Sequence, residues 1–251
     1  MLFVWYKVSF DEKWSRGSAV CETVYFFVEF VCVFPWKCVS LNNQNREKIM
    51  DGILRKLPIG IQTFEKLREG DYLYVDKTAL VWRIASTETP YFLSRPRRFG
   101  KSLLLSTFEA YFEGKKELFE GLAIADMEKE WKTYPVFHLD LNAEKYDSPQ
   151  ALVEILSRQL TQWELKYGKG EDEETLSGRF AGVIRRACEQ SGRGVVVLVD
   201  EYDKPLLQAL GDDALLDDYR KTLKAFYGVL KSSDRYLRFV FLTGVTKFAQ
   251  V

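Results

Sequence analysis

The chain has 251 residues, of which 47% are hydrophobic, and its 36 basic residues balance its 36 acidic residues. This length and apolar content suit one large α/β domain, alone or with an appendage. The balanced charge argues against a protein that coats nucleic acid through bulk electrostatics. A local basic groove is still compatible with a net charge of zero. The four cysteines show no metal-ligand spacing, which predicts free thiols in a reducing compartment, and we expect the cytoplasm.

Residues 1–49 are expected to form an extension outside the main domain, which should occupy residues 50–251. The apolar run 22–36 is interrupted by Glu29 and falls below the roughly 18–20 apolar residues that a membrane-spanning helix needs. A signal peptide fits poorly, because acidic residues precede the run and no small-x-small cleavage site follows it. Three interpretations stay open: a buried strand pair, a membrane-adherent segment, or a mis-called start with Met50 as the true initiator, which we favour.

From residue 50 onward the pattern alternates strands with helices, which is typical of a parallel sheet with helical crossovers. Apolar residues recur at helical spacing in the predicted helices, and a continuous apolar run ending in acid marks a strand buried on both faces. One helix should begin with Ser148 as its cap and Pro149 at its first position, and another should follow an acidic entry that suits the helix dipole. The predicted elements are strands over 90–95, 134–142, within 194–205 and over 236–247, and helices over 101–112, from 149 to near 168, within 170–192 and over about 214–231.

The stretch "SRPRRFGKS" over 94–102 resembles the end of a phosphate-binding loop, G-x-x-x-x-G-K-[ST], with Arg95 in the place of the first glycine. Gly100, Lys101 and Ser102 follow a predicted strand and open a predicted helix, where free backbone N–H groups and the helix dipole form an anion site. Lys101 would reach the β- and γ-phosphate oxygens, and the Ser102 hydroxyl would be a magnesium ligand. The alternative is a basic surface turn that only mimics such a loop.

The other loop residues are weaker candidates for contact with the nucleotide. Arg97, Arg98 and Phe99 would line the phosphate site together with the glycine turn, although either arginine is equally compatible with a solvated position. We expect Arg95 to adopt an ordinary φ and Gly100 alone to take the special conformation, because a positive φ would cost arginine about 1 kcal/mol or more.

Acidic residues follow the buried apolar strand in "VVVLVDEYD". Asp200 falls at the carboxyl end of this strand, where ligands bind in open α/β sheets, and its carboxylate can hold Mg²⁺ directly or through water. Glu201 follows it and can point at a water near the γ-phosphate as a general base. The alternative is that Asp200, Glu201 and Asp203 simply end a strand in a polar loop; the context of an upstream Gly-Lys-Ser turn favours the functional interpretation.

Thr243 in "FVFLTG" is a candidate for a hydrogen bond to the attacking water or the γ-phosphate, and equally for the first residue of a turn with Gly244. Lys77 could line the site, but a capped helix start at Asp76 or Thr78 explains that stretch as well. His138 is predicted to be a packed histidine, because the sequence offers it no obvious partner.

Four ordered segments resemble the predicted AAA-ATPase-like family of bacterial proteins. The resemblance implies an α/β P-loop NTPase fold, a three-layer αβα arrangement whose mainly parallel sheet has an additional strand between the Walker A and Walker B strands. Members of this family often precede a nuclease-like domain of the PD-(D/E)XK class. The four segments are "LPIGIQTFEKLREGDYLYVDKTALV", "YFLSRPRRFGKSLLLSTFEAYF", "VVVLVDEYDKPL" and "LRFVFLTGVTKF".

The resemblance carries roles onto matching positions. Lys101 and Ser102 match the Walker A lysine and hydroxyl, Asp200 and Glu201 match Walker B, and Thr243 matches the sensor. The family itself carries R-P-R-R-F-G-K-S, so an arginine in place of the first glycine is its normal form. Residues 1–49 match nothing in the family, and we expect the domain to be incomplete at its C-terminus.

The leading hypothesis is Mg²⁺-dependent binding of ATP followed by slow hydrolysis, with Glu201, Lys101 and Thr243 as the catalytic residues. The alternative is a nucleotide-dependent switch with negligible turnover that gates a partner, such as a C-terminal or separate nuclease-like domain. A role in acting on DNA rests on family analogy alone, because the sequence offers no convincing nuclease carboxylates. We expect no membrane partner, and an unpaired sheet edge would favour self-association into a homo-oligomer.

Overall fold

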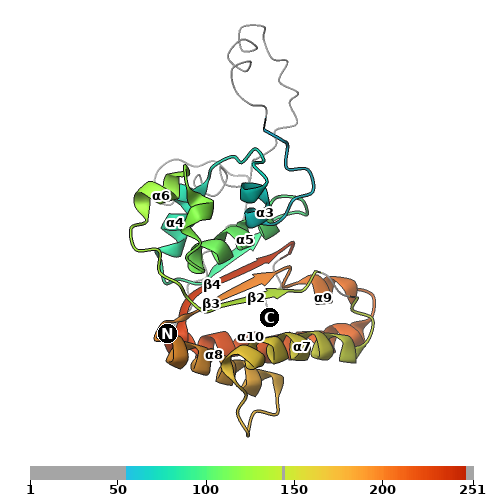
Figure 1. Cartoon of the computed structure of the whole chain (residues 1–251). Helices are drawn as coiled ribbons and strands as arrows, with labels where there is room; N and C mark the ends of the chain where they lie inside the picture. Colours follow the sequence, from blue (N-terminus) through green and yellow to red (C-terminus); the bar gives the residue numbers. More distant parts are fainter. Residues whose placement is uncertain (1–54, 143–144, 247–251) are drawn as a thin grey trace, which may run out of the picture.

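The computed structural model describes residues 55–142 and 145–246, so the predictions for the extension 1–49 and its apolar run lie outside the described residues. The described part contains one four-stranded sheet in which every pairing is parallel and the strand order is β1-β4-β3-β2 (Figure 1). The strands are β1 (Tyr91–Ser94), β2 (Val136–Asp140), β3 (Val195–Asp200) and β4 (Leu237–Gly244). β4 lies between the strand before the Gly-Lys-Ser turn and the acidic strand, which confirms the predicted additional-strand type.

Helices cover both faces of this sheet and make three layers (Figure 1). One face carries α3 to α6, and the other carries α7, α8 and α10. The predicted three-layer αβα arrangement is therefore confirmed. Within the described residues the α-helices are α3 (Phe64–Glu69), α4 (Thr78–Ala85), α5 (Lys101–Phe112), α6 (Ala123–Met127), α7 (Pro149–Tyr167), α8 (Leu176–Ser191), α9 (Lys204–Gln208) and α10 (Asp213–Ser232), and short 3₁₀-helices span Lys116–Phe119 and Asp234–Tyr236.

The apolar run of β3 supplies side chains to two separate cores. Val196 and Leu198 pack with α5 on one side of the sheet, whereas Val197 and Val199 pack with α7, α8 and α10 on the other. Every residue of β3 is buried, which confirms the prediction of a strand buried on both faces. Successive residues of a strand point to opposite faces, so one continuous apolar run holds both helical layers against the sheet.

Two predicted helix starts differ in their chemistry from the sequence-based expectation. Ser148 occupies the position before α7, but its side chain makes no capping bond; its carbonyl instead accepts a hydrogen bond of 2.7 Å from the Tyr219 hydroxyl. The first turn of α8 contains no acidic residue, and Thr175 caps it by accepting from the Gly178 N–H. The acidic run ends at Glu174, before the helix begins, and Glu173 forms an ion pair with Arg186 of α8.

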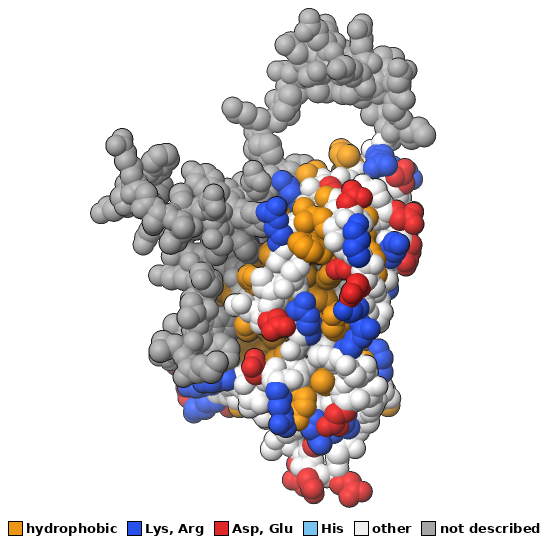
Figure 2. All heavy atoms as spheres, turned by 90° about the vertical axis from the view of Figure 1, so that its left-hand side faces the viewer, with side chains coloured by type: hydrophobic (Ala, Val, Ile, Leu, Met, Phe, Trp, Pro, Cys, Tyr) orange, Lys and Arg blue, Asp and Glu red, His pale blue; other side chains and the backbone are white. Residues whose placement is uncertain are grey.

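The described helices are short or polar relative to what a bilayer requires. Within residues 55–142 and 145–246, none of them combines the length and the apolar character of a membrane span. Figure 2 views the molecule from the side on which the strands begin, and there the Lys and Arg side chains are interspersed with Asp and Glu. This face therefore carries no broad field of one sign on the described residues, as the balanced composition predicts.

Candidate functional site

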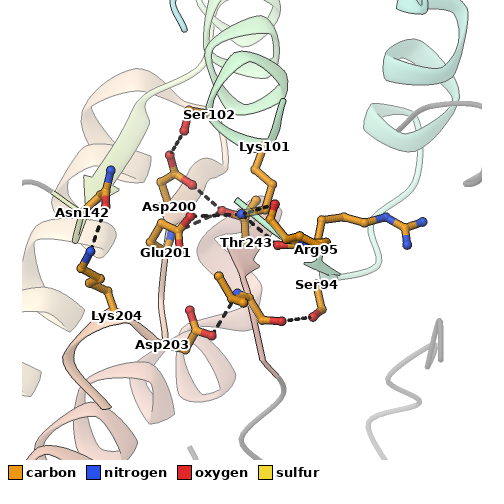
Figure 3. A network of polar contacts seen from close by, with 12 residues as sticks. Ser94, Arg95, Lys101, Ser102, Asn142, Asp200, Glu201, Asp203, Lys204 and Thr243 are labelled. Carbon is orange, nitrogen blue, oxygen red and sulfur yellow. Dashed lines mark hydrogen bonds and ion pairs between the residues drawn. The ribbon is translucent and has the colours of Figure 1, made fainter. Parts of the chain in front are cut away.

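The site lies at the carboxyl ends of β1, β3 and β4, where the amino end of α5 meets them (Figure 3). The backbone of the loop 95–100 turns sharply between β1 and α5. Gly100 has a φ of 75°, and Arg98 has a φ of 68°. The expectation that Gly100 alone takes a left-handed conformation is therefore wrong, whereas Arg95 has an ordinary φ as predicted. A second positive φ substitutes for the turn that an additional glycine would otherwise provide.

Lys101, the first residue of α5, is 5% exposed and points back into its own loop (Figure 3). Its Nζ donates to the carbonyl oxygens of Arg95 at 2.9 Å and Pro96 at 3.2 Å. The same Nζ lies 3.0 Å from Oε1 of Glu201 in a buried ion pair. The ammonium group is thus held by two loop carbonyls and one carboxylate, close to the amino end of α5.

Ser102, Asp200 and Thr243 form a second group of contacts beside the lysine. The Ser102 hydroxyl donates to Oδ2 of Asp200 at 2.5 Å, and the Thr243 hydroxyl donates to Oδ1 of the same carboxylate at 2.5 Å. Asp200 is 4% exposed and Thr243 is fully buried. Thr243 is the seventh residue of the eight in β4, so the alternative in which it starts a turn is wrong.

This arrangement fits a magnesium ion in the chemistry of its donors. Mg²⁺ prefers oxygen ligands, and a serine hydroxyl and a carboxylate already lie in contact at one point beside the lysine. The two residues are 98 positions apart in sequence. The structure therefore brings together the predicted metal ligands, Ser102 and Asp200, although whether they bind the ion stays a prediction.

Glu201 has an unusual backbone. Its φ is 53°, a left-handed conformation that costs a non-glycine residue roughly 1–3 kcal/mol. The residue is 7% exposed, and its Oε2 atom has no hydrogen-bond partner among the described residues. Strain and an unsatisfied buried oxygen often gather at functional sites, so both properties favour a functional role for Glu201 over a loop that simply ends a strand.

The remaining loop candidates lie further from these contacts. Arg97, Arg98 and Phe99 are all exposed on the loop surface, and Phe99 is 48% exposed. They are positioned to meet a ligand that approaches from solvent, but their role in nucleotide binding stays a prediction. The role of Lys77 was the other open question. Oδ1 of Asp76 accepts from the N–H and the hydroxyl of Thr78, the first residue of α4, so bonds that cap the start of this helix account for the stretch around Lys77.

Two side chains near the site make contacts that the sequence did not predict. His138 does have a partner: its Nδ1 lies 2.9 Å from Oε2 of Glu109. Glu109 lies on α5 seven residues after Ser102, which is two turns along one face of the helix. This spacing is the feature of the sequence that places Glu109 on the same helix face as Ser102. Asp203 is fully buried and bonds to the chain that follows β4. In the sequence, Asp203 stands out only as the third acidic residue of "DEYD".

The His138–Glu109 pair predicts a pH dependence of stability. Burial alone would lower the pKa of His138, but the hydrogen bond and charge of Glu109, with the charges of Asp200 and Asp140, raise the pKa above its usual 6.5. A raised folded-state pKa adds stability that is fully present below the unfolded pKa and is lost as pH rises through the folded pKa. The difference in free energy of unfolding between wild type and His138→Gln should therefore be largest at about pH 5.5 and shrink toward about pH 8.5.

Urea unfolding across that pH range measures this difference. Glu109→Gln removes the same ion pair. In a protein that carries Glu109→Gln, the effect of His138→Gln on the free energy of unfolding is therefore expected to lose this pH dependence. A His138→Gln effect that stays constant with pH would contradict the prediction.

A family model and a curated relative each match most of the chain. The model described as "Predicted AAA-ATPase" matches residues 58–251. The chain is 43% identical over 198 residues to the "Uncharacterized protein in vnfD 5'region" of Azotobacter chroococcum mcd 1, across 78% of this chain and 38% of that relative. The chain thus spans well under half the length of this relative. No solved structure gives a significant match.

Proposed function

The chain belongs to the predicted AAA-ATPase family, which supports a nucleotide-binding, ATPase-like function, and from that premise we propose that it binds ATP with Mg²⁺ and hydrolyses it slowly. The observation that carries the proposal is the junction of Lys101, Ser102, Asp200, Glu201 and Thr243. These residues come from three distant stretches of sequence, yet direct hydrogen bonds and one ion pair join them. Residues 50–251 are proposed to form this nucleotide domain.

Phosphate binding is assigned to the loop before α5 and to Lys101. The first backbone N–H groups of α5 have no partners within the helix and can bind an anion, and Lys101 is the first residue of that helix. Lys101 is tied to Glu201 and to two carbonyl oxygens, so engaging a phosphate means exchanging these contacts for phosphate oxygens. The ammonium has three N–H donors and already contacts three acceptors, so a phosphate oxygen has to displace at least one of them.

Ser102 and Asp200 would hold the magnesium ion, and the ion would supply positive charge that neutralises the phosphates. Thr243 keeps Asp200 in place through its hydroxyl, and the same Thr243 oxygen accepts from the Glu201 N–H at 3.3 Å. Glu201 would orient the attacking water and accept its proton on a carboxylate oxygen. The residues thus contribute positioning and charge more than covalent chemistry.

A nucleotide-dependent switch is the second candidate, and a specific contact favours it. The ion pair of 3.0 Å with Lys101 holds the Glu201 carboxylate away from the role of a base until the lysine is released. Turnover that depends on this release would be slow. The nuclease-like domain or other partner that such a switch would gate, and any homo-oligomer, remain proposals, because the chain covers 38% of its relative.

Two measurements on the full chain test the proposal. Mg-ATP is expected to raise the melting temperature, since ligand at 100 times its dissociation constant stabilises the folded state by about 2.7 kcal/mol. Phosphate release is expected to be slow and to require Mg²⁺. A thermal shift without hydrolysis would favour the switch, and the absence of both effects would overturn nucleotide binding itself. Adenosine alone is the matched ligand control, because it lacks the phosphates that Lys101 should bind.

A further inference from the structure

The buried carboxylate of Asp203 has no role in the chemistry described so far. It is fully buried and comes three residues after Asp200, directly before α9. Its Oδ2 accepts from the N–H of Val245 at 2.9 Å, the N–H of Thr246 at 2.6 Å and the hydroxyl of Thr246 at 2.8 Å. Three donors meet on one oxygen atom, so the carboxylate holds two consecutive residues of the chain that leaves β4.

The same chain segment is bound to the start of the phosphate loop. The Ser94 hydroxyl donates to the Val245 carbonyl at 2.8 Å, and the Arg95 N–H donates to the Gly244 carbonyl at 3.0 Å. Residues 244–246 therefore lie between the phosphate loop and Asp203 and are bonded to both. A shift of this segment would misalign the end of β4 and the turn at Glu201 relative to the phosphate loop.

The end of β4 is also bonded to the strained turn at Glu201. The Thr243 hydroxyl accepts from the Glu201 N–H, and the Thr243 carbonyl accepts from the Tyr202 N–H at 2.8 Å. A left-handed non-glycine residue persists only where its surroundings over-determine it. Asp203 completes this constraint, because it ties the far end of the same turn back to the residues that follow Thr243.

The second oxygen of Asp203 shows how closely this region is packed. Oδ1 has no hydrogen-bond partner among the described residues. A Cβ at Gly244 would lie 2.7 Å from this oxygen and 2.7 Å from the Tyr202 ring, so only glycine fits there. An unsatisfied buried carboxylate oxygen costs free energy, and a strand end in a polar loop would not require that cost.

We propose that Asp203 is a positioning residue that keeps Glu201 and Thr243 in register with the phosphate loop. It acts through the bonds just described and has no contact of its own with the reacting atoms. The inference rests on the proposed function, since it assigns Asp203 to the hydrolysis step of that same site.

Asp203→Leu is expected to lower kcat for Mg-ATP roughly 100-fold, because small misplacements of catalytic groups have effects of that size. The affinity for Mg-ATP should change little, because the Lys101 and Ser102 contacts do not involve Asp203. Asp203→Asn should retain most of the turnover, since its amide oxygen can still accept from Val245 and Thr246. Thr246→Val removes one donor of the three and should lower kcat less than Asp203→Leu does.

Asp212→Ala is the matched control for loss of stability. Asp212 caps α10 by accepting from the Leu215 N–H at 3.0 Å, so its removal weakens the start of that helix without touching the site. We expect Asp212→Ala to leave kcat unchanged. A folded Asp203→Leu protein with wild-type kcat would overturn the inference, and so would a rise in KM that accounts for the whole loss.

Hydrogen exchange gives a readout that needs no turnover. The amides of Glu201 and Tyr202 should exchange faster in Asp203→Leu than in wild type, and not in Asp212→Ala. If wild type binds Mg-ATP without hydrolysing it, hydrolysis fails as a function. The exchange rates of the Glu201 and Tyr202 amides then test the positioning role of Asp203 on their own. If Asp203→Leu does not fold, Thr246→Val carries the test: wild-type exchange at Glu201 and Tyr202 together with wild-type kcat would overturn the role of Asp203.

Discussion

Lys101→Ala is expected to weaken Mg-ATP binding by roughly 100-fold, since a hydrogen bond to a charged group contributes about 1.5–3 kcal/mol and the lysine makes several. The side chain is 5% exposed and occupies the turn where the loop backbone and the start of α5 converge. The remaining backbone N–H groups can still attract an anion, but they carry no full charge. Isothermal titration with Mg-ATP, on the full chain, measures the change.

Stability has to be separated from affinity in this variant. Removal of Lys101 leaves the Glu201 carboxylate buried without its ion-pair partner, which is strongly destabilising in general. The double variant Lys101→Ala/Glu201→Gln removes that buried charge, so it should regain stability but not affinity. Lys77→Ala is the matched lysine control and should bind as wild type does. The assignment of the site fails if Lys101→Ala binds Mg-ATP as tightly as wild type.

Glu201→Gln is expected to keep nucleotide binding and to lose turnover by about 100-fold or more, the usual contribution of a general base. The substitution preserves the shape of the side chain but removes its capacity to accept a proton. It also removes the charge that holds Lys101, so affinity for Mg-ATP should be equal to or greater than that of wild type. Single-turnover phosphate release and titration on the same preparation measure both quantities.

Glu189→Gln is the control for loss of a glutamate charge, because Glu189 is an exposed residue of α8 on the other side of the sheet. It should hydrolyse ATP at the wild-type rate. Equal turnover in Glu201→Gln and wild type would remove Glu201 from the mechanism. Tight binding with no turnover in either protein would support the switch instead.

Most of the elements and the type of fold follow from local patterns in the sequence. The helix predicted over 101–112 has those bounds in the structure, and the apolar run before Asp200 is the fully buried strand β3. These features are local: helical spacing of apolar residues, an uninterrupted apolar run and a glycine at a turn each act within a few residues. The match of Gly100, Lys101 and Ser102 to a phosphate loop was predictable for the same reason.

The tertiary structure alone decided which distant groups touch. Strand order places β4 between β1 and β3, and only this order lets Thr243 bond to Asp200 while residues 244–246 bond to the phosphate loop. The Lys101–Glu201 ion pair and the left-handed φ of Arg98 and Glu201 also depend on it. Such contacts join residues up to about 150 positions apart, and no local pattern encodes them. Their geometry follows from how parallel strands and packed helices bring separate loops to one edge of the sheet.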